Sequence, residues 1–177
     1  MLALANANAA VGLGTLFLEI ATVILIVAYF TRSRYQISRL IAGFFSQRGL
    51  LIAFLFATVG SILTLYYSEV LGIEPCSLCW WQRIFLYPQV VMLAIALWLK
   101  DTRIVIYSIA LSIIGAGFGL YQHALQMLGE GSLPCPATTV SCAQRFLFEF
   151  NHITFPFAAF VLFTFLIITM LFVRQRV

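Results

Sequence analysis

The sequence predicts an all-α integral membrane protein with five transmembrane helices. The chain of 177 residues is 63% hydrophobic and only 9% charged, whereas about a quarter of the residues in a soluble domain are charged. Its mean hydropathy is +1.04. The charged residues stand in short islands between long apolar runs, and a helix of about 20 apolar residues spans a hydrocarbon core about 30 Å thick.

Five apolar runs give the spans, which cover residues 11–30, 49–68, 78–98, 104–125 and 153–173. We interpret the first run as an uncleaved helix. A signal peptide begins with basic residues and ends in small ones, but here the small residues of ALANANAA precede the apolar core and no Lys or Arg stands before it. Residues 1–48 then hold the first helix and a basic cytoplasmic loop, and residues 49–177 hold the other four helices.

The basic residues predict how the chain is oriented in the membrane. Three segments on one side of a five-span protein carry most of them, namely Arg32, Arg34, Arg39, Arg48, Lys100, Arg103, Arg174 and Arg176. Cytoplasmic loops carry the Lys and Arg excess, so we expect the C-terminus in the cytoplasm and the N-terminus outside, with Arg83 and Arg145 breaking the pattern. No basic stripe interleaved with aromatic residues lies at a predicted soluble surface, which argues against nucleic-acid binding.

All four cysteines lie in or at the edge of the two outer segments, residues 69–77 and 126–152. They are Cys76, Cys79, Cys135 and Cys142. An even number of cysteines confined to the oxidising face of a membrane is typical of disulfide chemistry.

The first pair stands in EPCSLCWWQR, residues 74 to 83. Pro75 suits the first position of a helix, which would place Cys76 and Cys79 in the first turn of the third span. Backbone N–H groups and the helix dipole there lower a thiol pKa. Arg83 follows Cys79 by four residues on the same helix face. An arginine inside the membrane is costly, and a thiolate, a polar ligand head or snorkelling to the interface would offset the cost.

On the residues alone, three chemistries stay open for Cys76 and Cys79, and a redox-active dithiol is favoured. A static disulfide would close a very short loop and stabilise little. A zinc or copper site would have to include CPATTVSC, whose spacing is wider than that of the usual metal knuckle. The second pair, Cys135 and Cys142, lies in a loop rich in Gly and Pro, where a disulfide is either available for exchange or a structural staple.

Other polar and small residues add weaker predictions. His123 ends the fourth span and could donate a hydrogen bond to a ligand carbonyl, and Glu19 lies inside the first span without an identifiable partner. The segment AQRFLFEF predicts a short interfacial helix with an Arg145–Glu149 pair. Small residues in the fourth span, among them Gly115, permit close helix approach.

Together these residues resemble the disulfide bond formation protein B family (DsbB and its BdbC-type relatives) over residues 49–173. The matching features are C-x-x-C at the start of the second bundle helix, Arg83 four residues after Cys79, YQH at the end of the third helix, and an outer-loop cysteine pair followed by AQR. The resemblance implies that residues 49–177 are a redox domain built as a four-helix transmembrane bundle, and that residues 1–48 add one extra N-terminal transmembrane helix with a basic cytoplasmic loop. It also implies a quinone-dependent protein-disulfide oxidoreductase of the bacterial cytoplasmic (inner) membrane, and it leaves the extra helix unexplained.

The resemblance further implies two disulfides, Cys76–Cys79 and Cys135–Cys142. The loop pair would exchange with a soluble thioredoxin-fold, DsbA-like thiol oxidase. The C-x-x-C pair would pass the electrons to ubiquinone or menaquinone in the membrane quinone pool.

The resemblance places Arg83 and His123 at the quinone and implies no metal ligand. Two rival functions remain open. One is a non-catalytic membrane protein that binds zinc or copper through the four cysteines. The other is a quinone reductase similar to vitamin K epoxide reductase, whose C-x-x-C would be expected near the last helix.

Overall fold

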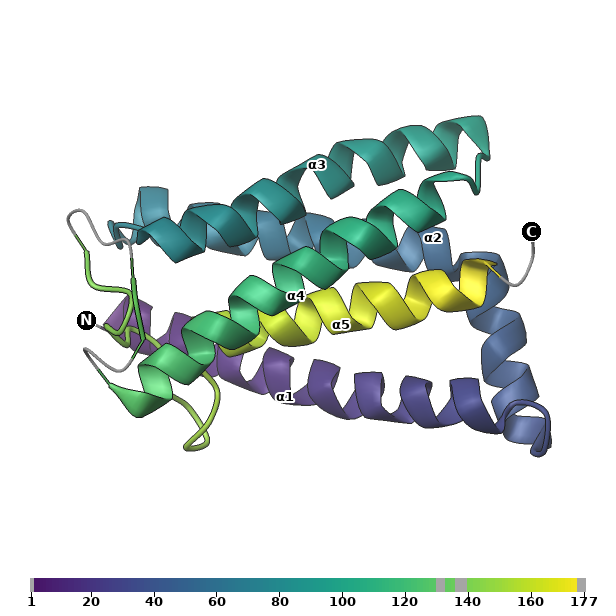
Figure 1. Ribbon diagram of the computed structural model, residues 1–177, viewed down its shortest axis with the longest axis horizontal. Coiled ribbons are helices and arrows are strands. Elements are labelled where there is room, and N and C mark those ends of the chain that lie inside the picture. Colours follow the sequence, from purple (N-terminus) through teal and green to yellow (C-terminus); the bar gives the residue numbers. More distant parts are fainter. Residues whose placement is uncertain (1, 130–132, 136–139, 175–177) are drawn as a thin grey trace.

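The computed structural model describes residues 2–129, 133–135 and 140–174. Within those ranges, five helices are long and apolar enough to cross a membrane. They are α1 (Leu2–Thr31), α2 (Gln36–Leu65), α3 (Ser77–Leu99), α4 (Ile104–Leu128) and α5 (Phe155–Arg174). The helices run along the long axis of the molecule (Figure 1). They confirm the predicted all-α, multi-pass membrane fold.

The start of α2 differs from the loop expected before residue 49. Residues 36–48 are helical and continuous with the rest of α2, and they cross one end of the bundle (Figure 1). Ile37 and Leu40 stay exposed on this segment, while the Phe45 ring packs 5.9 Å from that of Phe172 in α5. The segment combines apolar side chains with Arg39 and Arg48. Such an amphipathic helix is suited to the membrane interface, which explains why the segment is not a loop.

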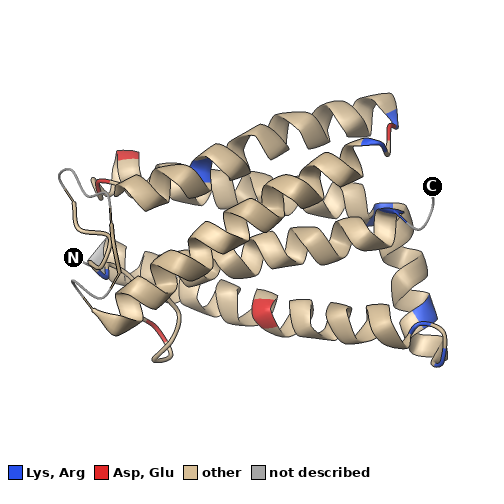
Figure 2. Ribbon diagram, viewed as in Figure 1, with Lys and Arg blue, Asp and Glu red and all other residues tan. Residues whose placement is uncertain are grey.

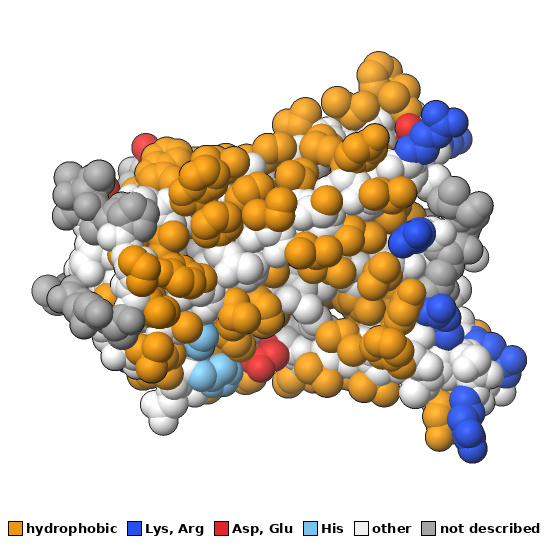
Figure 3. All heavy atoms as spheres, viewed as in Figure 1, with side chains coloured by type: hydrophobic (Ala, Val, Ile, Leu, Met, Phe, Trp, Pro, Cys, Tyr) orange, Lys and Arg blue, Asp and Glu red, His pale blue; other side chains and the backbone are white. Residues whose placement is uncertain are grey.

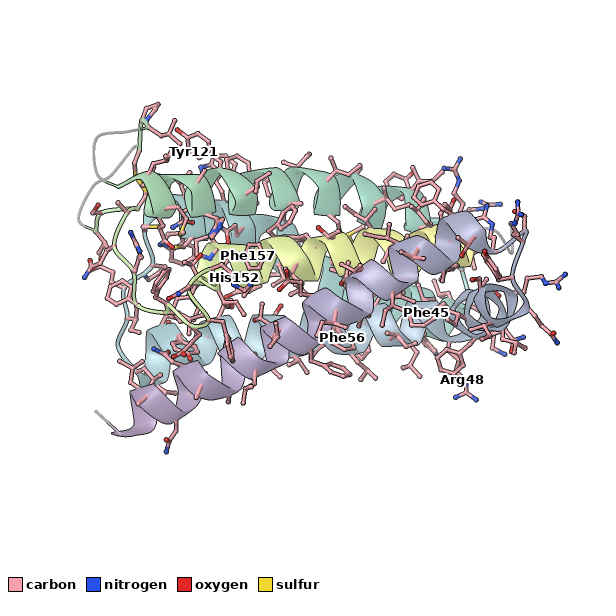
Figure 4. The ribbon with its side chains drawn as sticks, turned by 90° about the horizontal axis from the view of Figure 1, so that it is seen from below. Phe45, Arg48, Phe56, Tyr121, His152 and Phe157 are labelled. Atoms are coloured by element: carbon pink, nitrogen blue, oxygen red, sulfur yellow. A yellow bond between two sulfur atoms is a disulfide. The ribbon has the colours of Figure 1, made fainter. Side chains whose placement is uncertain are left out.

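The two ends of the bundle carry different side chains. Most Lys and Arg gather at the end of the bundle where α1 meets α2, α3 meets α4 and α5 ends (Figure 2), and an apolar belt covers the middle (Figure 3). The connections that precede α3 and α5 lie at the opposite end. We call the two the basic end and the cysteine end. In Figure 4, Arg48 lies at the basic end, and Tyr121 and His152 lie toward the cysteine end.

The core is built around α5, which packs against α1, α2 and α4. Phe163, Leu166, Met170 and Phe172 of this helix are fully buried. A Cβ atom added at Gly115 of α4 would lie 2.5 Å from the Phe163 ring. The glycine therefore lets α4 and α5 approach closely, as the small residues of this span predicted.

At the cysteine end, α2 continues into a π-helical turn, η1 (Tyr66–Val70). The Tyr67 hydroxyl donates to Asn8 Oδ1 at 3.0 Å, and Asn8 Nδ2 donates to the Phe146 carbonyl at 2.9 Å. The extra helix α1 is thereby joined to η1 and to the connection before α5. Single π turns occur frequently at functional sites, and this one lies beside the site described next.

Candidate functional site

Cys76 and Cys79 lie where α3 begins. Cys76 is the N-cap residue, with extended backbone, and its sulfur accepts a hydrogen bond from the Cys79 N–H at 3.4 Å. Both are free cysteines, and their Sγ atoms are 2.8 Å apart. The two sulfurs thus lie side by side, and the Cys76–Cys79 disulfide that the resemblance implies stays a prediction. Pro75 precedes the N-cap, so its predicted place at the first helical position is wrong, because the Cys76 sulfur caps the helix instead.

The side chain of Gln122, from α4, reaches both sulfurs. Its Nε2 lies 3.0 Å from Cys76 Sγ and 3.4 Å from Cys79 Sγ. Its Oε1 accepts a hydrogen bond from Gln82 Nε2 at 2.7 Å, and Gln122 is only 1% exposed. The Gln82 contact fixes the amide so that its N–H groups face the sulfurs. An N–H that donates to a sulfur favours the thiolate form.

The hydrogen bond with Cys79, together with burial, raises the pKa of the Cys76 thiol. The helix N-terminus alone predicted a lowered pKa for this residue. The direction is reversed because a second sulfur lies beside it, and a Cys76 thiol that keeps its proton can donate it to that neighbour.

Arg83 lies one turn deeper in α3 and is 8% exposed. Its Nη2 donates to the Thr64 carbonyl of α2 at 2.9 Å, and its guanidinium lies 5.3 Å from the centroid of the Trp80 ring. These contacts offset part of the cost of an arginine inside the membrane. A guanidinium has five N–H donors, so donors remain for a polar ligand group.

A cavity of about 790 Å³ lies beside Cys76, Cys79 and Arg83. All five helices contribute to its walls, and its lining is mostly apolar, with the Gln82 and Gln122 amides among the polar groups. Sites for small organic molecules have about this size and combine apolar walls with a few placed polar groups. The structure therefore brings the C-x-x-C pair and Arg83 together at one cavity.

Cys135 and Cys142 form a disulfide in the connection between α4 and α5. The Cys142 sulfur lies 3.7 Å from the Oγ atom of Ser77, and Ser77 is the residue that follows Cys76. Cys142 is 1% exposed, whereas Cys135 is half-buried. All four cysteines belong to one packed apolar cluster. The loop disulfide is thus placed against the start of α3, with one sulfur more accessible than the other.

The segment after Cys142 does not form the predicted interfacial helix. Residues 143–153 make turns and a single bridge between Glu149 and Ile153. Side chains of neighbouring helices take backbone carbonyls that a helix would use, and Gln126 Nε2 of α4 donates to the Gln144 carbonyl at 2.9 Å. Contacts across the fold therefore override the local helical pattern.

A family model described as disulfide bond formation protein DsbB matches residues 46–173. The chain belongs to the disulfide bond formation protein B family. The match spans most of α2 and all of α3 and α4, reaches almost to the end of α5, and contains both cysteine pairs. It begins after α1, so the extra helix lies outside the family match. Membership confirms the resemblance drawn from the sequence, and it makes the chain a membrane thiol oxidoreductase of the disulfide bond formation class.

Relatives in several bacteria agree with this assignment. A probable disulfide formation protein of Chlamydia trachomatis is 41% identical over 110 residues, which cover 62% of this chain and 80% of that protein. A probable disulfide formation protein C 1 of Bacillus cereus is 43% identical over 106 residues, covering 59% and 74%. A probable disulfide formation protein C of Halalkalibacterium halodurans is 35% identical over 126 residues, covering 70% and 92%. No solved structure matches the chain.

His123 lies apart from the residues that line the cavity. Its Nδ1 lies 2.9 Å from Thr154 Oγ1, and its ring centroid lies 4.9 Å from that of Phe157. The residue thus packs against the start of α5. Contact of His123 with a quinone stays a prediction.

Glu19 has a partner that the sequence did not reveal. Its Oε2 lies 3.3 Å from Nε2 of His152, and Figure 3 shows the histidines beside an acidic side chain on the apolar flank. The other ring nitrogen of His152 lies 2.8 Å from the Phe150 carbonyl. The hydrogen bond to Phe150, with the Glu19 carboxylate, raises the pKa of His152. The contact between Glu19 and His152 connects α1 to the segment before α5.

Sequence analysis missed the roles of Gln82, Gln122 and Gln126. All three are buried amides inside apolar spans, and all three line the cavity. The available signal was the cost of a polar side chain in a membrane span, together with the one-turn spacing of Gln122 and Gln126. As for metals, no group of three or more His, Cys, Asp and Glu side chains in the described part of the chain could hold an ion.

Proposed function

We propose that the protein is a quinone-dependent protein-disulfide oxidoreductase. It reoxidises a soluble thioredoxin-fold, DsbA-like thiol oxidase and passes the electrons to the membrane quinone pool, ubiquinone or menaquinone. The observation that supports this best is the single cluster that joins all four cysteines to a cavity beside Arg83.

The first exchange takes place at the loop disulfide. A thiolate of the reduced partner attacks Cys135, the more accessible sulfur, so the Cys135–Cys142 bond breaks and a mixed disulfide forms. The partner's second thiol then resolves the mixed disulfide. The partner leaves with a disulfide, and two electrons and two protons have moved to Cys135 and Cys142.

The second exchange moves the electrons inward. The Cys142 thiolate attacks the Cys76–Cys79 disulfide, and Cys135 resolves the product, so the loop disulfide reforms and the inner pair becomes a dithiol. The position of Cys142 against Ser77 supports this step. Cys135 and Cys142 lie close enough for the loop disulfide to reform, because the structure joins them by a disulfide bond.

The cavity fits a quinone in size and in chemistry. Its walls are mostly apolar, Arg83 is among its polar lining residues, and the Gln122 amide N–H groups lie at the sulfurs. A quinone bound there supplies an acceptor for two electrons and two protons. The chain's residues do the rest: Gln122 donates to both sulfurs, Arg83 favours negative charge beside Cys79, and the Cys76–Cys79 bond forms again as the pair is oxidised.

We place the cysteine end on the outer face of the bacterial inner membrane and the basic end in the cytoplasm. The gathering of Lys and Arg at one end supports this orientation (Figure 2). It leaves the N-terminus outside and gives a soluble partner access to Cys135. Residues 49–177 then act as the redox domain, and residues 1–48 as an addition to it.

Quinone reduction by the purified protein tests the proposal. The reaction is followed optically while reduced thioredoxin-fold oxidase is supplied. We expect turnover to be lost in Cys79→Ser and to fall about 10- to 100-fold in Arg83→Ala, the scale of a hydrogen bond to a charged group. Arg145→Ala is the matched control, because that guanidinium lies over Phe148 at 4.9 Å and outside the cavity. If neither ubiquinone nor menaquinone is reduced, the proposal is contradicted.

A further inference from the structure

We propose that α1 forms one wall of the quinone cavity and sets the size of the quinone that the cavity admits. This inference rests on the proposed function, because it names a specificity element of the same site. The wall is the face of α1 that carries Ala7, Ala10 and Gly14, which all line the cavity.

The small residues of this face leave space and do not serve close packing. Ala7, Ala10 and Gly14 recur at intervals of three and four residues, so they share one face of α1. A Cβ atom added at Gly14 meets no atom within 4 Å, whereas one added at Gly12 would lie 2.9 Å from the Glu149 side chain. Two glycines two positions apart in one helix thus have opposite surroundings, and only Gly14 faces open volume.

Contacts along its length hold α1 in place as a wall. At the cysteine end, Asn8 accepts a hydrogen bond from Tyr67 of η1 at 3.0 Å. Further along, Leu18 is buried in the main core, and Glu19 pairs with His152 at 3.3 Å. A helix fixed on both sides of the Ala7–Gly14 face keeps the distance between that face and the rest of the cavity constant.

The cavity opens toward the surroundings of the bundle between α1 and α2. Val59 and Leu63 of α2 line the cavity and are still 54% and 38% exposed. Asn6, Ala10 and Gly14 are the exposed lining residues on the α1 side. Residues that are both exposed and cavity-lining on two neighbouring helices mark a lateral opening into the hydrocarbon region. The apolar chain of a quinone would leave through it, against the small-residue face of α1.

Equilibrium binding of two quinones to the full-length protein in lipid nanodiscs tests this inference. One probe carries a decyl chain, the other is the same head group without a chain, and binding is read from quenching of tryptophan fluorescence. We expect Ala10→Phe and Gly14→Leu to weaken binding of the decyl quinone by about tenfold, the scale of overpacking, and to affect the chainless quinone less. Ala9→Phe is the matched control, because Ala9 is exposed and lies outside the cavity lining.

Thiol exchange with the partner, measured without quinone, reports separately on the loop disulfide and should stay at the wild-type rate in all three variants. Gly14→Leu keeps the test decisive if Ala10→Phe does not fold, since the space at Gly14 accepts a side chain. Wild-type affinity for the decyl quinone in Gly14→Leu would overturn the inference alone. A wild-type protein that binds neither quinone would overturn the proposed function, and this inference with it.

Discussion

The two ends of the bundle use their helices differently. Toward the basic end, a Cβ atom added at Gly49 would lie 2.6 Å from the Val173 side chain, and Phe172 is fully buried. At the cysteine end, Gly14 faces open space beside a cavity of about 790 Å³. Packing as dense as that of an ordinary protein interior would leave no room for a ligand there. The half of the bundle at the basic end is therefore tightly packed and stabilises the fold, whereas the half at the cysteine end is less tightly packed and leaves space for a ligand.

The largest effect is expected from Cys142→Ser at the cysteine end. The variant loses the sulfur that carries electrons from the loop to the inner pair, so turnover should fall by about 10³-fold or more, the scale of removing a covalent catalytic group. The variant also loses the Cys135–Cys142 disulfide and with it some stability, so turnover is measured at a temperature at which the variant stays folded. Near-normal turnover in the quinone assay would show that the loop cysteines are dispensable and would contradict a catalytic role for this part of the cysteine end.

Two buried glutamines allow the same substitution to be compared at the cavity and in the packed part of the bundle. Gln122→Leu removes the amide that donates to both sulfurs and should slow reoxidation of the prereduced inner pair by quinone about 10- to 100-fold. Gln89→Leu is the matched control, because Gln89 is fully buried and accepts hydrogen bonds from Ser108 and Ser112. It should lower the free energy of unfolding and leave that rate unchanged. Equal slowing by both variants would contradict the division of roles.

A smaller effect is expected from glycines in the packed part of α4. Gly115→Ala places a methyl group against the Phe163 ring and should lower the free energy of unfolding by about 1–3 kcal/mol. At Gly117 the added methyl meets nothing within 4 Å, so Gly117→Ala should be neutral or stabilising. Titration with a denaturing detergent measures both. Equal stability of the two variants would show that α4 and α5 are not tightly packed at Gly115.

The smallest effect concerns pH and the pairing of His152 with Glu19. The pKa of His152 is raised, so its protonated form favours the folded state. This contribution is complete below about pH 6.5, the ordinary histidine value, and is lost as the pH rises through the raised value. The hydrogen-exchange protection factors of α1 amides, which are corrected for the intrinsic pH dependence of exchange, should therefore fall over that range, and His152→Ala should abolish this fall. His123→Ala, which removes the other ring packed on Phe157, should keep it.

Much of the fold could be predicted because the membrane leaves few alternatives. An apolar run of sufficient length must be helical, so all five spans were found from hydropathy. The parts that the sequence did not predict depend on contacts between distant residues. The start of α2 is helical because its apolar residues face the interface and Phe172, and residues 143–153 stay non-helical because Gln126 takes a carbonyl of that segment.

The candidate site divides in the same way. Cys76 and Cys79 lie at the start of α3 and Arg83 lies in the next turn. Their spacing in the sequence is therefore enough to place the three side chains close together. Gln122 reaches the sulfurs from a helix 46 positions further along the chain, and His152 pairs with Glu19 over 133 positions. Spacing carries no information over such separations, and only the packing of the helices brings these groups into contact.

The most direct test of the relay is to locate the electrons after a single transfer. Fully oxidised protein, freed of quinone, is mixed with one equivalent of reduced partner, alkylated and mapped by mass spectrometry. The relay predicts label on Cys76 and Cys79 with the Cys135–Cys142 disulfide intact. Label confined to Cys135 and Cys142, with the inner pair still oxidised, would contradict it.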